Sequence, residues 1–284
     1  MKFFYVFLLC AISTGLSAMD WPQAEARILK NFGSNNHGSA QLSDSFAGEG
    51  PVFTADAGEL LFQRSSENRA SRLPSANGAF AALDHGDNMI TVYGHLQNES
   101  RSLPAKINKN DVVGFAGSSG IAKQEGFNFS IFDRKEKRWV NPSLIIKPEE
   151  ENRVPSIVKV LLRDVDGKEF DLGLTRTVPQ GHLGILVHSE DTRQSHTDVL
   201  MPQKIVSSVN GMEAGLLAFE TIYARDGKLA MYRNGLVSLS VVYGSAPAVE
   251  AGDFWFNRGQ ALLDIVVEDI AGNSRKVQYR LFVE

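Results

Sequence analysis

The segment that decides the fold reads LDHGDNMITVYGHL and spans residues 83–96. Short apolar runs lie on both sides of Gly86-Asp87-Asn88, a combination of residues typical of tight turns. This pattern predicts two β-strands joined by a turn. Further short apolar runs, separated by turn residues, lie at 52–55, 60–62, 80–83, 112–115 and 127–132. The first half of the chain is therefore predicted to be mainly antiparallel sheet.

Four blocks between Phe46 and Ile146 resemble, in order, the LytM/lysostaphin-type peptidoglycan metalloendopeptidase family. They read PVFTADAGEL (51–60), LDHGDNMITVYGHL (83–96), INKNDVVGFAGSSG (107–120) and WVNP (139–142). They are similar to the family's opening strand pair, its "YaHL" block, its glycine-rich "GsTG" block and its closing "NP". The resemblance implies an antiparallel LytM-type β domain over residues 19–147.

The resemblance also implies a chemistry. Members of the family hold zinc with an H-x-x-x-D pair and with the second histidine of an H-x-H strand. The first histidine of H-x-H and the histidine of "YaHL" then act on the attacking water and the oxyanion, while zinc lowers the pKa of that water. His95 matches the "YaHL" histidine and is the one retained catalytic candidate.

The zinc motifs are otherwise missing. Counting back from Asn141-Pro142 places the H-x-H strand on Asn128 and Ser130, with Phe129 and Ile131 facing the core. Residues two or four apart in extended chain point to the same face, so Asn128 and Ser130 are expected to face the groove with His95. Counting back from Pro51 places H-x-x-x-D on Ser39 and Ser43, or one residue later on Ala40 and Asp44.

Amide and hydroxyl groups are weak ligands for zinc, so no metal and no other cofactor is expected. A fallback zinc site would need a bent loop that brings His37, Asp44 and His95 together. Each group also has a structural interpretation: His95 as a packing residue beside Tyr93, Asn128 and Ser130 as space fillers, and Asp44 as a loop cap. His85, next to the turn, is interpreted as structural.

The N-terminus is interpreted as an export signal. Residues 1–18 contain one lysine, a short apolar run and then small residues, and the run is too short to span a bilayer. An uncleaved anchor is one alternative. The sole cysteine, Cys10, lies in that run, so a lipoprotein signal is another. We therefore expect a periplasmic or extracellular protein with no membrane span after cleavage and no disulfides.

The second half is predicted to be an immunoglobulin-like β-sandwich over residues 156–284. A charged, proline-bracketed stretch at 147–155 marks the domain boundary, Asn210-Gly211 predicts a hairpin, and a terminal hairpin turns near Asp269 and Gly272. Three histidines also lie in this half. His182, His188 and His196 have no carboxylate or cysteine pattern that completes a metal site, so they are interpreted as solvent-facing.

Composition excludes some classes of function. The net charge is −4, with 29 basic and 33 acidic residues among 284 and no run of like charge in either half. No nucleic-acid surface or polybasic membrane patch is therefore expected.

Three hypotheses remain open at this stage. The first is a catalytically inactive LytM-like module that binds peptidoglycan or regulates a cell-wall hydrolase, as degenerate members of the family do. The second is an active zinc endopeptidase with a rearranged metal site. The third is a structural envelope protein whose domains only mediate protein contacts.

Overall fold

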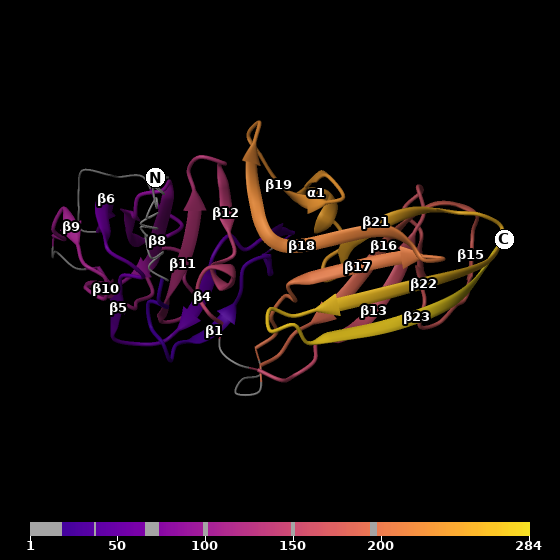
Figure 1. The fold of residues 1–284 in the computed structure, drawn as a ribbon, viewed down its shortest axis with the longest axis horizontal. Helices are drawn as coiled ribbons and strands as arrows, with labels where there is room; N and C mark the ends of the chain where they lie inside the picture. Colours follow the sequence, from indigo (N-terminus) through magenta and orange to yellow (C-terminus); the bar gives the residue numbers. More distant parts are fainter. Residues whose placement is uncertain (1–18, 37, 66–73, 99–101, 149–150, 194–197) are drawn as a thin grey trace, which may run out of the picture.

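The computed structural model describes residues 19–36, 38–65, 74–98, 102–148, 151–193 and 198–284. Strands make up nearly all of its regular structure, and the strand pairs are antiparallel apart from the short pair β15–β23. The all-β prediction is confirmed. The molecule is elongated, with the first half of the chain at one end and the second half at the other (Figure 1).

The first half contains twelve strands and one 3₁₀ turn among the described residues. They are β1 Arg27–Lys30, β2 Asn35–Asn36, β3 Ser39–Ala40, β4 Asp44–Ala47, β5 Pro51–Phe53, β6 Gly58–Arg64, β7 Ala79–Asp84, β8 Met89–Leu96, β9 Lys106–Ile107, β10 Val112–Phe115, β11 Gly126–Asp133, β12 Arg138–Val140 and η1 Pro142–Leu144.

The sheet of the first half runs in the order β12-β11-β8-β7-β6-β9, with β4 also paired to β11. Alternation within β11 makes one face apolar: Phe127, Phe129 and Ile131 are buried, while Asn128 and Ser130 between them are half-buried. Phe129 and Ile131 thus face the core as the sequence predicts. Phe46 of β4 stacks on Phe127, with ring centroids 4.7 Å apart, and joins the same core.

The second half contains eleven strands and one short helix among the described residues. They are β13 Ser156–Arg163, β14 Glu169–Asp171, β15 Thr177–Val178, β16 Gly181–Glu190, β17 Lys204–Val209, β18 Met212–Arg225, β19 Lys228–Arg233, β20 Leu236–Ser238, α1 Leu239–Val242, β21 Val249–Phe256, β22 Gly259–Glu268 and β23 Ser274–Val283.

Two sheets enclose one core in this half. One has the order β14-β13-β16-β21, and the other contains β15-β23-β22-β17-β18. Buried residues from both sheets, including Leu162, Ile185 and Ile265, belong to the same cluster. The predicted hairpin at Asn210-Gly211 joins β17 to β18, and both residues have positive φ (51° and 81°), as such a turn requires. The immunoglobulin-like topology of this half stays a prediction.

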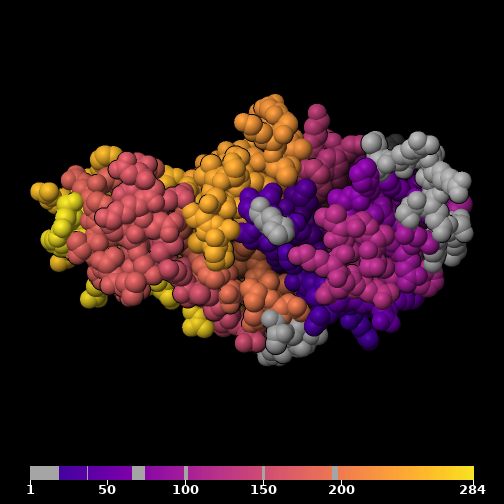
Figure 2. Space-filling view, turned by 180° about the vertical axis from the view of Figure 1, so that it is seen from behind, coloured from indigo at the N-terminus to yellow at the C-terminus, as the bar shows by residue number. Residues whose placement is uncertain are grey.

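The two halves share backbone and core. Strand β12 pairs with β18, so that one sheet continues from the first half into the second. The side chain of Asn141 donates to the carbonyl of Phe219 (2.9 Å), and its backbone N–H donates to Glu220 (2.9 Å). The N-terminal segment, indigo in Figure 2, lies against orange residues of the second half.

The segment just before β4 belongs to this joint. Phe32 and Ala40 are buried in the core of the second half, although both belong to the first half of the chain. Asn31 exchanges two hydrogen bonds with the backbone of Met201, and the hydroxyl of Tyr243 donates to the carbonyl of Gly33. Buried contacts therefore hold the two halves together, and the domain boundary at 147–155 stays a prediction.

Candidate functional site

Strand β11 carries the two groove residues predicted from the sequence. Asn128 lies opposite Ser45 of β4 on one side and opposite Gly94 of β8 on the other. Ser130 lies two residues further along, opposite Val92. Directly paired residues share a face of an antiparallel sheet, so Ser45, Asn128 and Ser130 all lie on the face opposite to the buried phenylalanines.

A chain of hydrogen bonds joins these neutral side chains. The Ser45 hydroxyl donates to Oδ1 of Asn128 (2.6 Å), and Nε2 of Gln41 lies 2.9 Å from the hydroxyl oxygens of both Ser43 and Ser45. Asn36 Nδ2 in turn donates to Oε1 of Gln41 (3.2 Å). We call Asn36, Gln41, Ser43, Ser45 and Asn128 the amide–hydroxyl network. Each member satisfies part of another's hydrogen-bonding capacity, with no charged group involved.

The network corrects the expected position of the H-x-x-x-D spacing. The residues with this spacing that meet β11 at Asn128 are Gln41 and Ser45. The two expected pairs, Ser39 with Ser43 and Ala40 with Asp44, do not. The count back from Pro51 assumed a longer connection than the chain has. The turn between β4 and β5 consists of residues 48–50 only, which shifts the pair by one or two residues.

Asp44 lies on the other face of β4. It pairs with the buried Phe129, is itself fully buried, and accepts a hydrogen bond from the backbone N–H of Phe32 (2.7 Å). Burial raises its pKa to about 7, although that N–H and the guanidinium of Arg193 favour the charged form. Asp44 therefore acts as a cap for the backbone at Phe32 and does not face Asn128.

His95 occupies an unusual backbone position at the end of β8. Its φ is +62°, and its backbone N–H donates to the carbonyl of Asn77 (2.7 Å). Nδ1 lies 2.8 Å from the carbonyl oxygen of Ser119. A carbonyl only accepts, so Nδ1 carries a proton, and in the neutral ring Nε2 keeps its lone pair. His95 is almost fully buried, with 8% of its surface exposed.

The fallback metal set is not assembled by the described residues. Asp44 faces away from the network, and His95 is anchored to the glycine-rich loop at Ser119. His37, the third member, lies outside the described residues, as does the proposed signal at 1–18 with Cys10. Within the part of the chain that the structure describes, no helix is both long and apolar enough to cross a membrane.

The other histidines have their own partners. His85 bridges the carbonyl of Ala57 (2.8 Å from Nδ1) and the hydroxyl of Thr91 (2.7 Å from Nε2), which makes it a structural brace between strands. His182 lies 3.1 Å from Asp253, and His188 lies 3.4 Å from Glu190. His196 lies outside the described residues.

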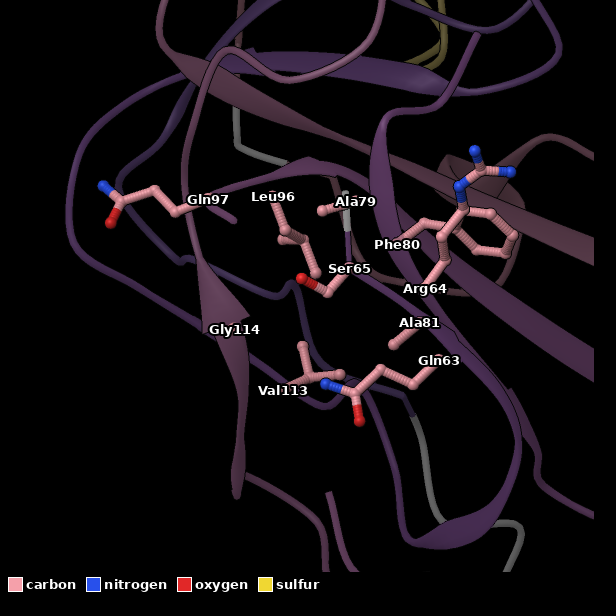
Figure 3. Close-up of a pocket in the computed structure, with 10 residues that line it drawn as sticks. All are labelled: Gln63, Arg64, Ser65, Ala79, Phe80, Ala81, Leu96, Gln97, Val113 and Gly114. Atoms are coloured by element: carbon pink, nitrogen blue, oxygen red, sulfur yellow. The ribbon is translucent and has the colours of Figure 1, made fainter. Parts of the chain in front are cut away.

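A small space lies between β6, β7, the end of β8 and β10. It has a volume of about 20 Å³, enough for about one water molecule. Figure 3 shows Leu96, Ser65 and Val113 around it, and Arg64 and Phe80 turned away from it. It is too small for a peptide, so this space is not a peptide-binding site.

The comparison with known families decides the type of this domain. Residues 43–142 match the model of peptidase family M23. This segment is an M23-type domain. A second family model matches residues 154–284. No curated protein matches the sequence.

Solved structures show partial likenesses to the chain. A mutant catalytic domain of the prophage-encoded M23 protein EnpA from Enterococcus faecalis is 18% identical, with a TM-score of 0.36, over 44% of this chain and 95% of that one. A zinc-containing peptidase from Vibrio cholerae is 18% identical, with a TM-score of 0.37, over 44% and 39%. A chain of the SpoIIQ–SpoIIIAH pore-forming complex is 15% identical, with a TM-score of 0.37, over 46% of this chain and 92% of that one. The family match, and not these likenesses, carries the assignment.

The donor set of the M23-type domain does not fit the zinc that the family name implies. Zinc in proteins is held by imidazole, thiolate or carboxylate groups. The spaced pair and the β11 strand instead present Gln41, Ser45, Asn128 and Ser130, and three of these four belong to a network of neutral hydrogen bonds. The importance of Gln41 and Ser45 was missed from the sequence, because only the β4–β11 pairing shows that they meet Asn128.

Proposed function

We propose that this protein is an exported cell-envelope protein whose M23-type domain binds peptidoglycan, or regulates its hydrolysis, without cleaving it. One observation carries the proposal: amides and hydroxyls stand where the family's zinc ligands would be, and they are hydrogen-bonded to one another. Without zinc there is no Lewis acid to polarise a peptide carbonyl and no metal to lower the pKa of a water molecule.

Two groups, one on β11 and one at the end of β8, suit a peptide ligand. Within the described residues, the Nδ2 group of Asn128 donates to no protein acceptor, so it can donate to a peptide carbonyl. Nε2 of His95, whose other nitrogen is engaged by Ser119, can accept from a peptide N–H. Ser130 adds a hydroxyl two residues along β11. Together these side chains would recognise the polar backbone of a stem peptide.

The expected affinity is weak. Hydrogen bonds of this kind contribute about 1 kcal/mol each in water. A few of them barely exceed the cost of immobilising a peptide. A binding or regulatory role tolerates this, because many weak contacts on a polymeric wall act together. Export is supported by the signal-like sequence of residues 1–18.

The test is retention on purified cell walls. Wild-type protein is expected to be retained weakly and to release no peptide fragments, with or without added zinc. His95→Asn and Asn128→Ala are expected to reduce retention several-fold. Asparagine is chosen at position 95 because it tolerates the positive φ there. His182→Ala, at a half-exposed histidine of the second half, is the matched control and should leave retention unchanged.

Two results would contradict the proposal. Release of fragments by the wild type, abolished by chelation, would make the domain a working metalloendopeptidase. Equal retention of all four proteins would remove His95 and Asn128 from the site and favour a role in protein contacts alone.

A further inference from the structure

Three carboxylates from distant parts of the chain meet beside the connection between the two halves. Glu151 lies in the connecting stretch, Asp191 directly follows β16, and Asp269 directly follows β22. One carboxylate oxygen from each lies within 4.8 Å of the other two. We call these three residues the junction carboxylates.

The junction carboxylates are buried and mostly lack partners. Asp191 is 4% exposed, Asp269 is fully buried, and the side chain of Glu151 is 4% exposed. Asp269 accepts two hydrogen bonds from Asn273, which close the β22–β23 turn. Both carboxylate oxygens of Glu151 and Oδ1 of Asp191, in contrast, have no hydrogen-bond partner. Burying such oxygens without compensation is costly.

Positive charge near the junction carboxylates is limited. Arg193 lies 3.9 Å from Glu151, beyond hydrogen-bond distance. Its positive charge also lowers the pKa of Asp191 and of Asp44, and the charge of Arg153 lowers that of Asp191. Burial and mutual repulsion still raise the pKa of Glu151 to about 7 and that of Asp191 to about 6. The arrangement concentrates more negative charge than the neighbouring arginines compensate.

We propose that Glu151, Asp191 and Asp269 bind one calcium ion that fastens the connecting stretch to the second half. Oxygen-only ligands select hard cations. The three oxygens lie within 4.8 Å of one another, close enough to share one ion. Calcium accepts an irregular shell of carboxylates and water, whereas magnesium demands a near-ideal octahedron, so three carboxylates from separate segments suit calcium better. This site is independent of the function proposed for the M23-type domain.

A solvent-open hollow lies next to the cluster. It has a volume of about 770 Å³ and is lined by Asn152 and Thr192, the residues that follow Glu151 and Asp191, and also by Arg153 and Arg275. Calcium takes six to eight oxygen ligands, so the proposed site needs water molecules in addition to the three carboxylates. The carbonyl of Glu151 also accepts from Asn273 Nδ2 (3.3 Å), so the bound ion would reinforce an existing contact between the connecting stretch and the β22–β23 turn.

The experiment is thermal unfolding of the full chain in chelator, in 1 mM CaCl₂ and in 1 mM MgCl₂. Calcium is expected to raise Tm by about 5 °C and magnesium by much less. Glu151→Gln and Asp191→Asn should each raise Tm in chelator, because they remove repulsion, and should abolish the increase caused by calcium. Glu190→Gln, next to Asp191 but outside the cluster, is the matched control and should keep the full calcium response.

The variants also separate calcium from protons. If the carboxylates merely share protons, Glu151→Gln and Asp191→Asn will raise Tm equally in chelator and in calcium, and the wild type will not respond to calcium. That result overturns the proposal. A calcium response that Glu190→Gln loses as fully as Glu151→Gln would place the ion elsewhere and overturn it as well.

Discussion

Two polar clusters in this molecule solve the burial of oxygen atoms in opposite ways. In the M23-type domain, Gln41, Ser45 and Asn128 are neutral and hydrogen-bond one another. At the junction, Glu151 and Asp191 are acidic and have buried oxygens without partners. The oxygens of the first cluster have partners within it, and those of Glu151 and Asp191 in the second do not. The place where the family name leads one to look for a metal is thus the poorer metal site of the two.

The comparison shows that the chemistry of the donors matters more than the position in the fold. Replacing the charged ligands of a metal site by neutral groups removes the repulsion between the ligands as well as the affinity for the metal. The amides and hydroxyls that remain can then hydrogen-bond to one another. Gathering carboxylates has the opposite effect, because each additional buried charge must be neutralised by a cation or a proton. Substitutions that give one cluster the character of the other test this contrast.

The largest effect is expected from rebuilding the zinc ligands. The variant Gln41→His, Ser45→Asp, Asn128→His, Ser130→His should bind zinc at least about 1000-fold more tightly than the wild type, since imidazole and carboxylate replace weak ligands. Zinc titration against a competing chelator measures this. The matched controls keep the two β11 histidines and place His and Asp at positions 39 and 43, or His at 40 beside the natural Asp44.

Those controls should not gain zinc, because neither pair meets β11 at Asn128. Equal zinc affinity in a control and in the Gln41/Ser45 variant would show that the β4–β11 register is wrong. The double variant Asn128→His, Ser130→His should also fail to bind zinc tightly, since it lacks the first ligand pair.

A smaller effect is expected from Asp44→Asn. The raised pKa means that folded Asp44 keeps its proton up to about pH 7, while the unfolded chain loses it near pH 4. The free energy of unfolding therefore falls as pH rises from 4 to 7, by up to about 4 kcal/mol from this residue. Asp44→Asn should remove most of that slope, measured by urea unfolding at several pH values.

The exposed Glu59→Gln serves as the control for Asp44→Asn and should leave the slope unchanged. An unaltered slope in Asp44→Asn would mean that Asp44 stays ionised in the folded protein. The positive charge of Arg193 would then offset the cost of burying the Asp44 carboxylate. Asp44 would in that case be a buried charge, like the junction carboxylates.

The smallest effect is expected from Ser45→Ala. It removes the donor to Asn128, which is half-buried, and an acceptor of Gln41, which is 9% exposed. The loss should be about 1 kcal/mol in the free energy of unfolding. Ser102→Ala, at an exposed serine, should change it by less than about 0.5 kcal/mol. A decrease of more than about 3 kcal/mol in the free energy of unfolding would show that the network is part of the structural core and not the remnant of a binding site.

Sequence patterns predicted what depends on neighbouring residues. The alternation around Phe129 and Ile131 assigned the buried face of β11, and Asn210-Gly211 marked a real hairpin. Both features follow from the two-residue period of a strand or from local turn chemistry. The family blocks likewise led to the M23-type domain, because each block is a strand with its turn.

Long-range pairing was beyond the same reasoning. The shift from Ser43 to Ser45 depends on the length of one turn and on the pairing of β4 with β11. The joint of β12 with β18 brings together residues about 80 positions apart, although composition at 147–155 suggests separate units. The junction carboxylates come from positions 151, 191 and 269, and no local pattern links them.

We propose that the metal site of this protein lies at the junction and not in the M23-type domain. Elemental analysis of the full chain after dialysis against equimolar zinc and calcium at neutral pH distinguishes the two places. The expected result is about one calcium and no stoichiometric zinc per chain, with the calcium lost in Glu151→Gln. About one tightly bound zinc per chain, lost in His95→Asn, with no calcium, would contradict it.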